Sequence, residues 1–342
     1  MRNRNVVLTI IIAVFVIIIY TLYGGYKAKM LVIDGLNATS IRIMNEKIYV
    51  TNSSNNIFMA TIPKLQAKKI KSLDFQEVDI ISYNSIIHDY YSQKLSKIQG
   101  IGSFELNKGY RISKINEYVV NKVVISDLFS EHSFIVALLS DGQIITCGDN
   151  DYGQLGNGTT VKSSAPVILN LKQNFIDIAV MDRTALAVDS TGALWVWGDN
   201  RAGACIIDGA DFVLEPHKLD LGEKITAVYS SQMHSFALSE SGNIYSWGET
   251  VEVLGSDKIV KLPMKINTIN NIVMVDTQQL TATALDADGS VFLWGKNYNL
   301  GQNYDYNYSP IKIYSSDGVK DISITPIGVA VIENNGVLRF IR

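Results

Sequence analysis

A hairpin-like unit recurs about every fifty residues in the carboxy-terminal two-thirds of the chain, and this spacing constrains the fold more than any other feature. In each unit an apolar stretch ends in a short turn sequence with a glycine, and a second apolar stretch follows. Successive turn glycines are 50, 50, 47 and 47 residues apart: Gly142, Gly192, Gly242, Gly289 and Gly336. Such turns supply the positive φ that a tight β-hairpin needs. The pattern therefore predicts a repeat protein built of β-hairpins.

Small and bulky residues hold fixed places around each turn. An alanine stands five residues before each of the first four glycines, and another glycine stands six residues after: Ala137, Ala187, Ala237 and Ala284, then Gly148, Gly198, Gly248 and Gly295. Trp197, Trp247 and Trp294 precede three of the later glycines, and Cys147 takes the fourth place, where we expect a buried, inert thiol. The alanines would let neighbouring sheets approach closely, and the tryptophans would fill the space between them. Because one small antiparallel sheet cannot bury both of its faces, stacking around an axis predicts an all-β propeller.

The residues that follow the second glycine carry a more specific pattern, D-G-x…W-G-x-N-x-x-G-Q-L-G. The first unit has it nearly in full, at Asp141, Gly142, Gly148, Asn150, Gly153, Gln154, Leu155 and Gly156. The second unit has Gly192, Trp197, Gly198, Asp199, Asn200 and Gly203, and the fourth has Gly289, Trp294, Gly295, Asn297, Leu300, Gly301 and Gln302. The third keeps Trp247, Gly248, Leu254 and Gly255 but carries Glu249–Val253 where the loop belongs.

This pattern resembles the regulator of chromosome condensation repeat family. The resemblance implies a seven-bladed propeller of four-stranded blades that acts chiefly as a binding platform. Relatives in that family act as nucleotide-exchange factors for small GTPases, as ubiquitin-ligase accessory domains, or as secreted inhibitors of β-lactamase. The fold alone does not decide which of these roles transfers to this chain.

The spacing predicts how many blades the chain can form. The mean repeat of 48.5 residues gives residues 30–342 room for about 6.5 units. The pattern of Ser40–Asn55 predicts a degenerate hairpin, and Ile86–Gly100 could contain another. With both, the chain would form seven blades. A ring of six blades is also compatible with the spacing. The last unit ends after its third strand, so part of Tyr26–Asp34 could supply the fourth, although Leu31–Ile33 could equally begin the first blade.

An apolar segment near the amino terminus stands apart from the repeats. Residues 6–23 carry no charge and are just long enough to cross a bilayer core as a helix. Arg2 and Arg4 precede the segment, which favours a cytoplasmic amino terminus. The sequence YGGYKAKM that follows has no convincing small-x-small cleavage site, so an uncleaved anchor is favoured over a cleaved signal peptide or a buried core helix.

The predicted domain organisation follows from this segment and the repeats. Residues 1–5 form a cytoplasmic tail, 6–23 a transmembrane helix, 24–30 a juxtamembrane linker and 31–342 the propeller. The clearest repeats occupy 125–342, and 31–124 holds degenerate blades. The propeller would then be extracellular or periplasmic.

The sequence offers little support for catalysis. No zinc-ligand spacing, nucleophile elbow or phosphate-binding loop occurs, so no metal, cofactor or enzymatic activity is predicted. A net charge of −3 gives no electrostatic case for a nucleic-acid partner. His234 begins one repeat strand, and Asp141, Asp149 and Asn150 recur at turn positions, so structural roles are expected for all four. The alternative is a hydrolase or lyase with a site in the central channel.

The richest feature outside the repeat is a group of tyrosines in the stretch Lys296–Pro310. Tyr298, Tyr304, Tyr306 and Tyr308 are predicted to lie in a connecting loop and to contribute to a binding surface, because tyrosine recurs at interfaces. The alternative is a loop that packs its own aromatics against the propeller. The sequence thus predicts a membrane-tethered protein-interaction module with an unknown protein partner. An exchange-factor-like regulator is the alternative if the propeller is cytoplasmic.

Overall fold

The computed structural model describes most of residues 112–341 and shorter stretches from residue 21 onward. The larger gaps are 1–20, 62–75, 79–103, 107–111, 127–132, 249–259 and 297–305, and breaks of one to four residues occur elsewhere. Every element in the described ranges is a β-strand. The prediction of an all-β fold is confirmed for this part of the chain.

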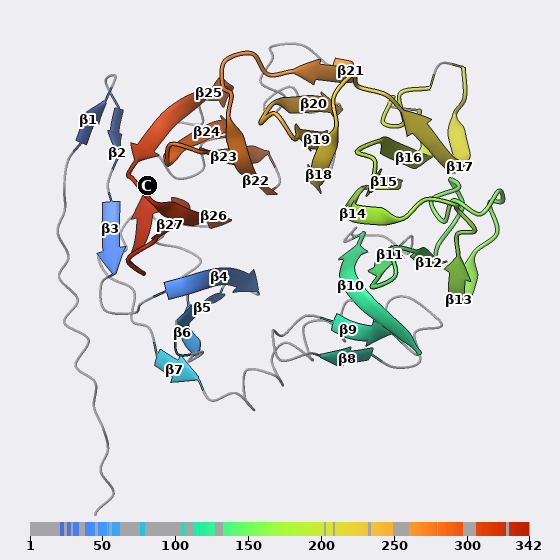
Figure 1. The fold of residues 1–342 in the computed structure, drawn as a ribbon, viewed down its shortest axis with the longest axis horizontal. Helices are drawn as coiled ribbons and strands as arrows, with labels where there is room; N and C mark the ends of the chain where they lie inside the picture. Colours follow the sequence, from blue (N-terminus) through green and yellow to red (C-terminus); the bar gives the residue numbers. More distant parts are fainter. Residues whose placement is uncertain are drawn as a thin grey trace, which may run out of the picture.

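Six sheets with the same strand order surround a central axis (Figure 1). Five of them have four strands, and the sixth is the β10–β13 part of a sheet that β8 and β9 extend. The strands are β4 Ala38–Met44, β5 Lys47–Asn52, β6 Ile57–Thr61, β7 Gln76–Val78; β8 Phe104–Leu106, β9 Ile112–Ile115, β10 Tyr118–Ile125, β11 Phe134–Leu139, β12 Ile144–Gly148, β13 Ser163–Ile168; β14 Phe175–Met181, β15 Thr184–Asp189, β16 Leu194–Asp199, β17 Phe212–Leu219; β18 Ile225–Ser231, β19 His234–Ser239, β20 Ile244–Gly248, β21 Val260–Lys265; β22 Ile272–Gln278, β23 Thr281–Asp286, β24 Ser290–Lys296, β25 Tyr306–Ser315; and β26 Val319–Thr325, β27 Gly328–Glu333, β28 Leu338–Ile341 with β3 Met30–Ile33. The first strand of each sheet (β4, β10, β14, β18, β22 and β26) lies nearest the axis (Figure 1).

The predicted hairpins coincide with strand pairs. The turns with Gly142, Gly192, Gly242, Gly289 and Gly336 join the second and third strands of their sheets. The predicted degenerate hairpin at Asn45–Glu46 falls between β4 and β5, the first and second strands of its sheet, so the predicted equivalence with the glycine turns is wrong. The hairpin expected within Ile86–Gly100 falls outside the described residues. Six blade-like sheets are therefore described, and a seventh stays a prediction.

The last sheet is completed by the amino-terminal segment. β3 pairs antiparallel with β28, with Leu338 opposite Ile33 and Ile341 opposite Met30. The prediction that part of Tyr26–Asp34 supplies the missing strand is confirmed, and the alternative, in which Leu31–Ile33 begins the first blade, is wrong. β4 follows as the innermost strand of the next sheet, and Ala38 N donates to Gly336 O at 2.7 Å across the junction. The first and last repeats of the chain are thus neighbours in the ring.

Only the end of the predicted transmembrane helix falls within the described residues. Thr21–Tyr23, its last three residues, form strand β1, which pairs with β2 at Tyr26–Ala28 inside the predicted linker. The helix prediction is wrong for these three residues, because a β-branched and an aromatic residue suit a strand and the partner satisfies the backbone. Residues 6–20 lie outside the described part. Among the described residues there is no helix of the length and hydropathy that a membrane span requires.

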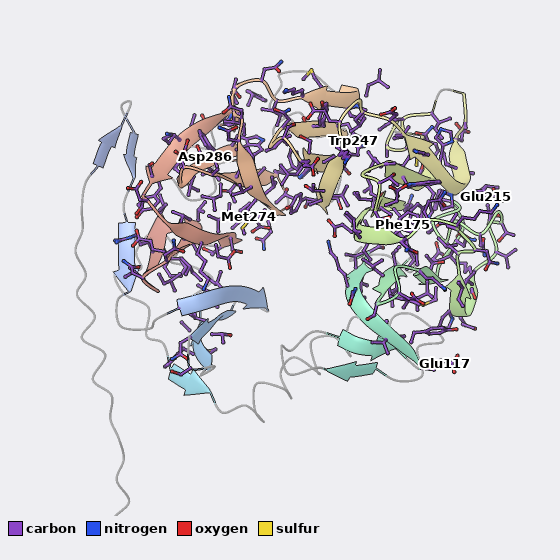
Figure 2. All side chains as sticks on the ribbon, viewed as in Figure 1. Glu117, Phe175, Glu215, Trp247, Met274 and Asp286 are labelled. Carbon is purple, nitrogen blue, oxygen red and sulfur yellow. The ribbon has the colours of Figure 1, made fainter. Side chains whose placement is uncertain are left out.

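The repeat alanines and tryptophans are buried, and the core clusters that hold all of them except Ala137 extend across neighbouring sheets. Ala137, Ala187, Ala237 and Ala284 are fully buried, and so are Trp197, Trp247 and Trp294. Figure 2 shows side chains filling the spaces between adjacent sheets, with Trp247 inside the ring of sheets and Glu215 at its outer edge. Cys147, in the fourth tryptophan position, is also buried, and burial raises the pKa of its thiol to about 12. Neither Cys147 nor Cys205 forms a disulfide.

The glycines at the repeat positions have the backbone conformation that the pattern predicts. All five turn glycines have positive φ, and so does the second set: Gly142, Gly192, Gly242, Gly289, Gly336, Gly148, Gly198, Gly248 and Gly295. At the turns, the glycine carbonyl also accepts a bond from the next blade. Phe175 N donates to Gly142 O and Ile225 N donates to Gly192 O, both at 2.8 Å. One residue type thus closes each hairpin and joins it to the following sheet.

Candidate functional site

The four tyrosines singled out in the sequence are not gathered into one described loop. Tyr298 and Tyr304 fall outside the described residues. Tyr306 and Tyr308 belong to strand β25 and not to the connecting loop, which corrects their predicted position. Alternation of Tyr with polar residues has the period of a strand, and β24 provides the partner. Tyr308 is 41% exposed on the outermost strand of its sheet, and its role in binding stays a prediction.

The loop between β12 and β13 is organised by one buried amide. Asn150 Nδ2 donates to the carbonyl oxygens of Thr159 at 2.9 Å and Val161 at 3.1 Å, and Asn150 Oδ1 accepts from Leu155 N at 2.8 Å. Asn200 repeats this arrangement in the next blade, where its Oδ1 accepts from Cys205 N at 2.9 Å. The structure therefore supports the predicted structural role of the repeat asparagine.

Each of these loops is also fixed to the following blade by a tryptophan. Trp197 Nε1 donates to the carbonyl oxygen of Gln154 at 2.9 Å, and Trp247 Nε1 donates to the carbonyl oxygen of Ala204 at 3.1 Å. A Cβ on Gly156 would lie 2.8 Å from the indole of Trp197, so this glycine allows the close approach. The loops after β12 and β16 are thus held rigidly on one face of the propeller.

A group of aromatic and cationic side chains lies on this face, and we call it the loop-face cluster: Tyr152, Arg183, Arg201 and Phe212. The guanidinium of Arg183 lies 4.3 Å from the ring centroid of Tyr152, and that of Arg201 lies 4.6 Å from it. The ring of Phe212 meets Tyr152 edge-on, with centroids 5.6 Å apart. The four residues come from the loops after β12 and β16, the turn before β15 and the start of β17. Two neighbouring blades therefore build the cluster.

Ion pairs hold the cationic side chains of this face in place. Arg201 bonds Asp199 through Nε at 3.0 Å and Nη2 at 2.5 Å. Burial opposes ionisation of Asp199, but the bonds from Arg201 outweigh it and lower the pKa of the carboxyl. Lys162 Nζ lies 2.6 Å from Asp149 Oδ1, which is almost fully buried. Within the described part of the chain, Arg183 Nε is buried without a hydrogen-bond partner.

The sequence did not reveal the loop-face cluster. Tyr152 and Phe212 are sixty residues apart, and each looks ordinary in its own repeat. The positions of these residues in the repeats are the one feature of the sequence that could have indicated the cluster. Tyr152 lies in the loop of the best-matched repeat, while Arg183 and Arg201 lie at two turns of the next repeat. Only the register between neighbouring blades shows that these turns lie on the same face.

Carboxylates on the innermost strands join neighbouring blades along the central channel. Asp177 on β14 accepts from Val228 N on β18 at 2.8 Å and pairs with Lys122 Nζ on β10 at 2.6 Å. Asp276 on β22 accepts from Ile324 N on β26 at 2.7 Å. Asp321 on β26 is held in the same manner by the backbone of Ile41 on β4. Each carboxylate therefore bonds the backbone of the next innermost strand.

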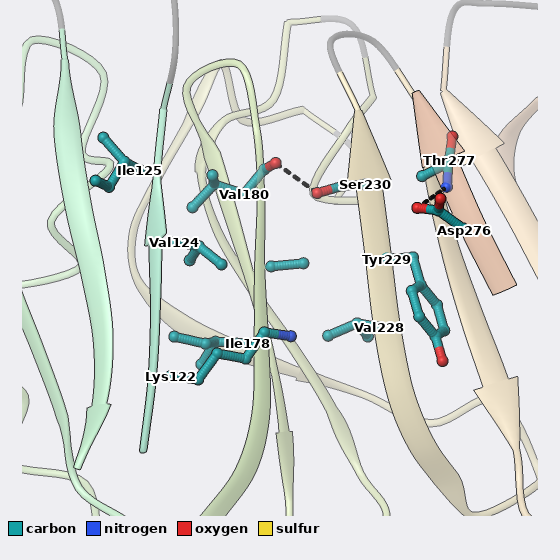
Figure 3. Close-up of a pocket in the computed structure, with 11 residues that line it drawn as sticks. Lys122, Val124, Ile125, Ile178, Val180, Val228, Tyr229, Ser230, Asp276 and Thr277 are labelled. Atoms are coloured by element: carbon teal, nitrogen blue, oxygen red, sulfur yellow. Dashed lines mark hydrogen bonds between the residues drawn. The ribbon is translucent and has the colours of Figure 1, made fainter. Parts of the chain in front are cut away.

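A cavity of ≈300 Å³ lies among four innermost strands (Figure 3). Its lining residues are Lys122, Val124, Ile125, Ile178, Ala179, Val180, Val228, Tyr229, Ser230, Asp276 and Thr277. Thr277 contacts His234, whose Nε2 lies 2.7 Å from the Thr277 hydroxyl. Burial lowers the pKa of His234 to about 3, which keeps the ring neutral and fits its predicted structural role. Among the described residues no group of His, Cys, Asp and Glu side chains is arranged to hold a metal ion.

Comparison with known proteins identifies the repeat. Residues 141–188 match the regulator of chromosome condensation (RCC1) repeat. The human E3 ubiquitin-protein ligase HERC2 is 30% identical over 123 residues, which is 34% of this chain and 2% of that protein. The Xenopus laevis regulator of chromosome condensation is 28% identical over 110 residues, or 31% of this chain and 26% of the relative. The mouse secretion-regulating guanine nucleotide exchange factor is 30% identical over 142 residues, or 38% and 31%. The matched segments thus span less than a third of each relative.

Solved structures show the same fold over most of the chain. Human WBSCR16 superposes with a TM-score of 0.56 at 16% identity, covering 91% of this chain and 72% of that one. Prp20p from Saccharomyces cerevisiae gives 0.51 at 17% identity, covering 91% and 68%. At these identities the likeness concerns the fold alone.

Proposed function

We propose that this chain, an RCC1-like propeller, is a protein-interaction module that docks its partner on the loop-face cluster. The observation that carries the proposal is the stacking of two guanidinium groups on Tyr152, with Phe212 against the same ring. Aromatic residues and arginine are enriched at the centres of protein interfaces. Phe212 is 37% exposed and the Arg201 side chain 47%, so a partner can reach both.

The cluster is rigid before any partner binds. Trp197 and Asn150 fix the loop that carries Tyr152, and Asp199 fixes Arg201. Side chains that are already ordered lose little conformational entropy on association, which favours affinity. The described surface thus offers aromatic and cationic groups that are ordered in advance.

The relatives are consistent with a binding role. The similar curated proteins include a guanine nucleotide exchange factor and a ubiquitin-protein ligase. The structure of Prp20p was described together with its binding to Gsp1p and histones, and another yeast structure holds Kap60 bound to Prp20. These partners belong to those proteins. For this chain, they support a protein partner as a class.

Replacing Arg201 by alanine is expected to weaken partner binding by about thirty-fold, since an arginine anchor at an interface centre is worth about 2 kcal/mol. The measurement is the amount of cross-linked or co-purified partner per molecule of full-length protein, compared between wild type and variant. Lys312→Ala is the matched control, because Lys312 lies over the ring of Phe292 in a cation–aromatic pair on another blade. Equal loss in both variants, or loss in neither, would contradict the proposal.

We also propose that residues 6–23 anchor the propeller on the outer side of a membrane. The support is the uncharged apolar segment and the arginines before it. Protease added to intact cells is then expected to remove the propeller and leave a short anchored fragment. Protection of the propeller until the membrane is permeabilised would instead place it in the cytoplasm, where an exchange-factor-like role becomes the better assignment.

We infer that the chain acts by binding and not by catalysis. The channel carboxylates of Asp177 and Asp276 accept backbone hydrogen bonds from the next blade, and His234 is buried and neutral. Groups used in this way hold blades together and are poorly placed to transfer protons. A hydrolytic or lyase activity that disappears in an Asp177→Asn or Asp276→Asn variant with intact folding would overturn this inference.

A further inference from the structure

The central cavity differs from the loop-face cluster in position and in chemistry. It lies among the innermost strands β10, β14, β18 and β22, and the side chains that face it are partly apolar and partly charged (Figure 3). Its volume of ≈300 Å³ falls at the lower end of the range for small-molecule sites. The cavity is therefore large enough for a short organic chain or one long side chain.

Carboxylates and cations both stand on the innermost strands. Asp177, Asp276 and Asp321 are the carboxylates of β14, β22 and β26. Lys122 pairs with Asp177 at 2.6 Å, and Lys320 on β26 partly offsets the charge of Asp321. Burial, together with the nearby charge of Asp276, raises the pKa of Asp321. Asp276 and Asp321 are thus close enough to repel each other, and two such carboxylates favour a cation between them.

Asp276 lines the cavity and has hydrogen bonds but no cation. Its Oδ2 accepts from Ile324 N at 2.7 Å and from the Ser323 hydroxyl at 3.1 Å, and its Oδ1 accepts from Thr277 N at 2.9 Å. Within the described part of the chain no ion pair involves this carboxylate. Burial raises the pKa of Asp276 despite these bonds, because a buried carboxylate without a counter-charge is destabilised.

The remaining walls suit an apolar body with a positive end. Val124 and Val180 supply aliphatic surface on β10 and β14, and Tyr229 on β18 lies beside Asp276, on the side of β18 that faces β22 (Figure 3). Burial raises the pKa of Tyr229 to about 12, so the phenol stays neutral and its ring can face a cation. An aromatic ring beside a carboxylate is a combination that stabilises ammonium groups in proteins.

We propose that the central cavity binds an ammonium group carried on a short apolar chain, with Asp276 as the counter-ion and Tyr229 beside it. This site goes beyond the proposed docking function and does not depend on the loop-face cluster. The ammonium could belong to a free alkylamine or to a lysine side chain of a bound polypeptide. Both present the same chemistry to the cavity.

The test uses three probes of one shape and different charge: n-pentylammonium, n-pentanol and pentanoate. Binding to the full-length protein in detergent is measured by ligand-observed NMR titration. We expect n-pentylammonium to bind at least about ten-fold more tightly than either other probe, as a charged hydrogen bond is lost with the ammonium. Equal binding of n-pentanol would overturn the proposal. The capped peptide acetyl-Gly-Lys-Gly-amide serves as a further probe: tighter binding than n-pentylammonium assigns the group to a polypeptide, and weaker binding assigns it to a free amine.

Two site variants, one control variant and a pH series keep the test independent of any folding defect. Asp276→Asn is expected to lose about ten-fold in affinity for n-pentylammonium, whereas Asp317→Asn, an exposed residue before β26, should lose none. Tyr229→Leu should weaken the ammonium probe and leave n-pentanol unchanged. Affinity should also rise with pH as the carboxyl of Asp276 ionises, with Tyr229, Asp321 and, through Thr277, His234 as its titratable neighbours. An affinity that is independent of pH, or unchanged in Asp276→Asn, contradicts the site.

Discussion

Replacing Trp197 by alanine is expected to lower the free energy of unfolding by about 3–5 kcal/mol, the usual cost of deleting a large buried aromatic. Trp197 is 0% exposed and belongs to a core cluster that extends across neighbouring sheets. The truncation removes apolar contacts and leaves a cavity between sheets. It also leaves the carbonyl oxygen of Gln154 without its indole donor, and an unsatisfied buried acceptor adds to the cost. Urea unfolding, with the midpoint and slope fitted separately, measures the change.

Two companion variants separate the contributions at this site. Trp197→Phe keeps much of the apolar volume but removes the indole donor, so it should cost about 1–3 kcal/mol. Phe212→Ala removes an aromatic that is 37% exposed and should cost less than about 1 kcal/mol. If Trp197→Ala costs no more than Phe212→Ala, the tryptophan does not hold neighbouring blades together in the way described.

Replacing Gly198 by alanine is expected to destabilise the fold by about 3 kcal/mol or more, through backbone strain and a forced displacement of the neighbouring strand. Gly198 has φ +106°, which side-chain-bearing residues rarely adopt. A Cβ at this position would lie 2.2 Å from the carbonyl oxygen of Arg183 and 3.1 Å from Thr184 Cα. The clash involves backbone, so a rotamer change cannot relieve it. The measurement is again the free energy of unfolding in urea.

Gly222 provides the matched control for this substitution. Its φ of +74° is also positive, but a Cβ there would meet nothing within 4 Å. Gly222→Ala should therefore show only the conformational cost of a left-handed residue, about 1–2 kcal/mol. The difference between the two variants isolates the contact with Arg183. Equal costs would show that Gly198 is required for its conformation alone.

The residues at the repeat positions could be predicted from the sequence because each one meets a requirement of the local backbone or packing. A turn with positive φ needs glycine, as at Gly142, and a narrow space between sheets needs alanine, as at Ala187. The pairing of β3 with β28 was also predictable, because an amino-terminal strand can complete the last sheet of a closed propeller. The glycine and alanine positions are determined within a single repeat, and their recurrence along the chain allows them to be recognised in the sequence.

The sites were harder to predict because they depend on how neighbouring blades align. Tyr152 and Phe212 come from neighbouring blades, and no residue pattern in either repeat predicts their contact. The channel carboxylates do not recur at one repeat position: Asp177 and Asp321 each precede the central buried residue of their strand, whereas Asp276 follows it. The sequence predicts a connecting loop at Tyr306 and Tyr308, but pairing with β24 makes them strand residues.

The claim that the loop face is the docking surface is tested most directly by site-specific photo-crosslinking in living cells. A benzophenone amino acid is placed at Val161, 70% exposed in the same loop as Tyr152, or at Val119, 58% exposed beside the turn at the other end of the blade. We expect a discrete protein adduct from Val161, none from Val119, and loss of the Val161 adduct when Arg201→Ala is added. Equal adducts from both positions, or an adduct from Val119 alone, would contradict it.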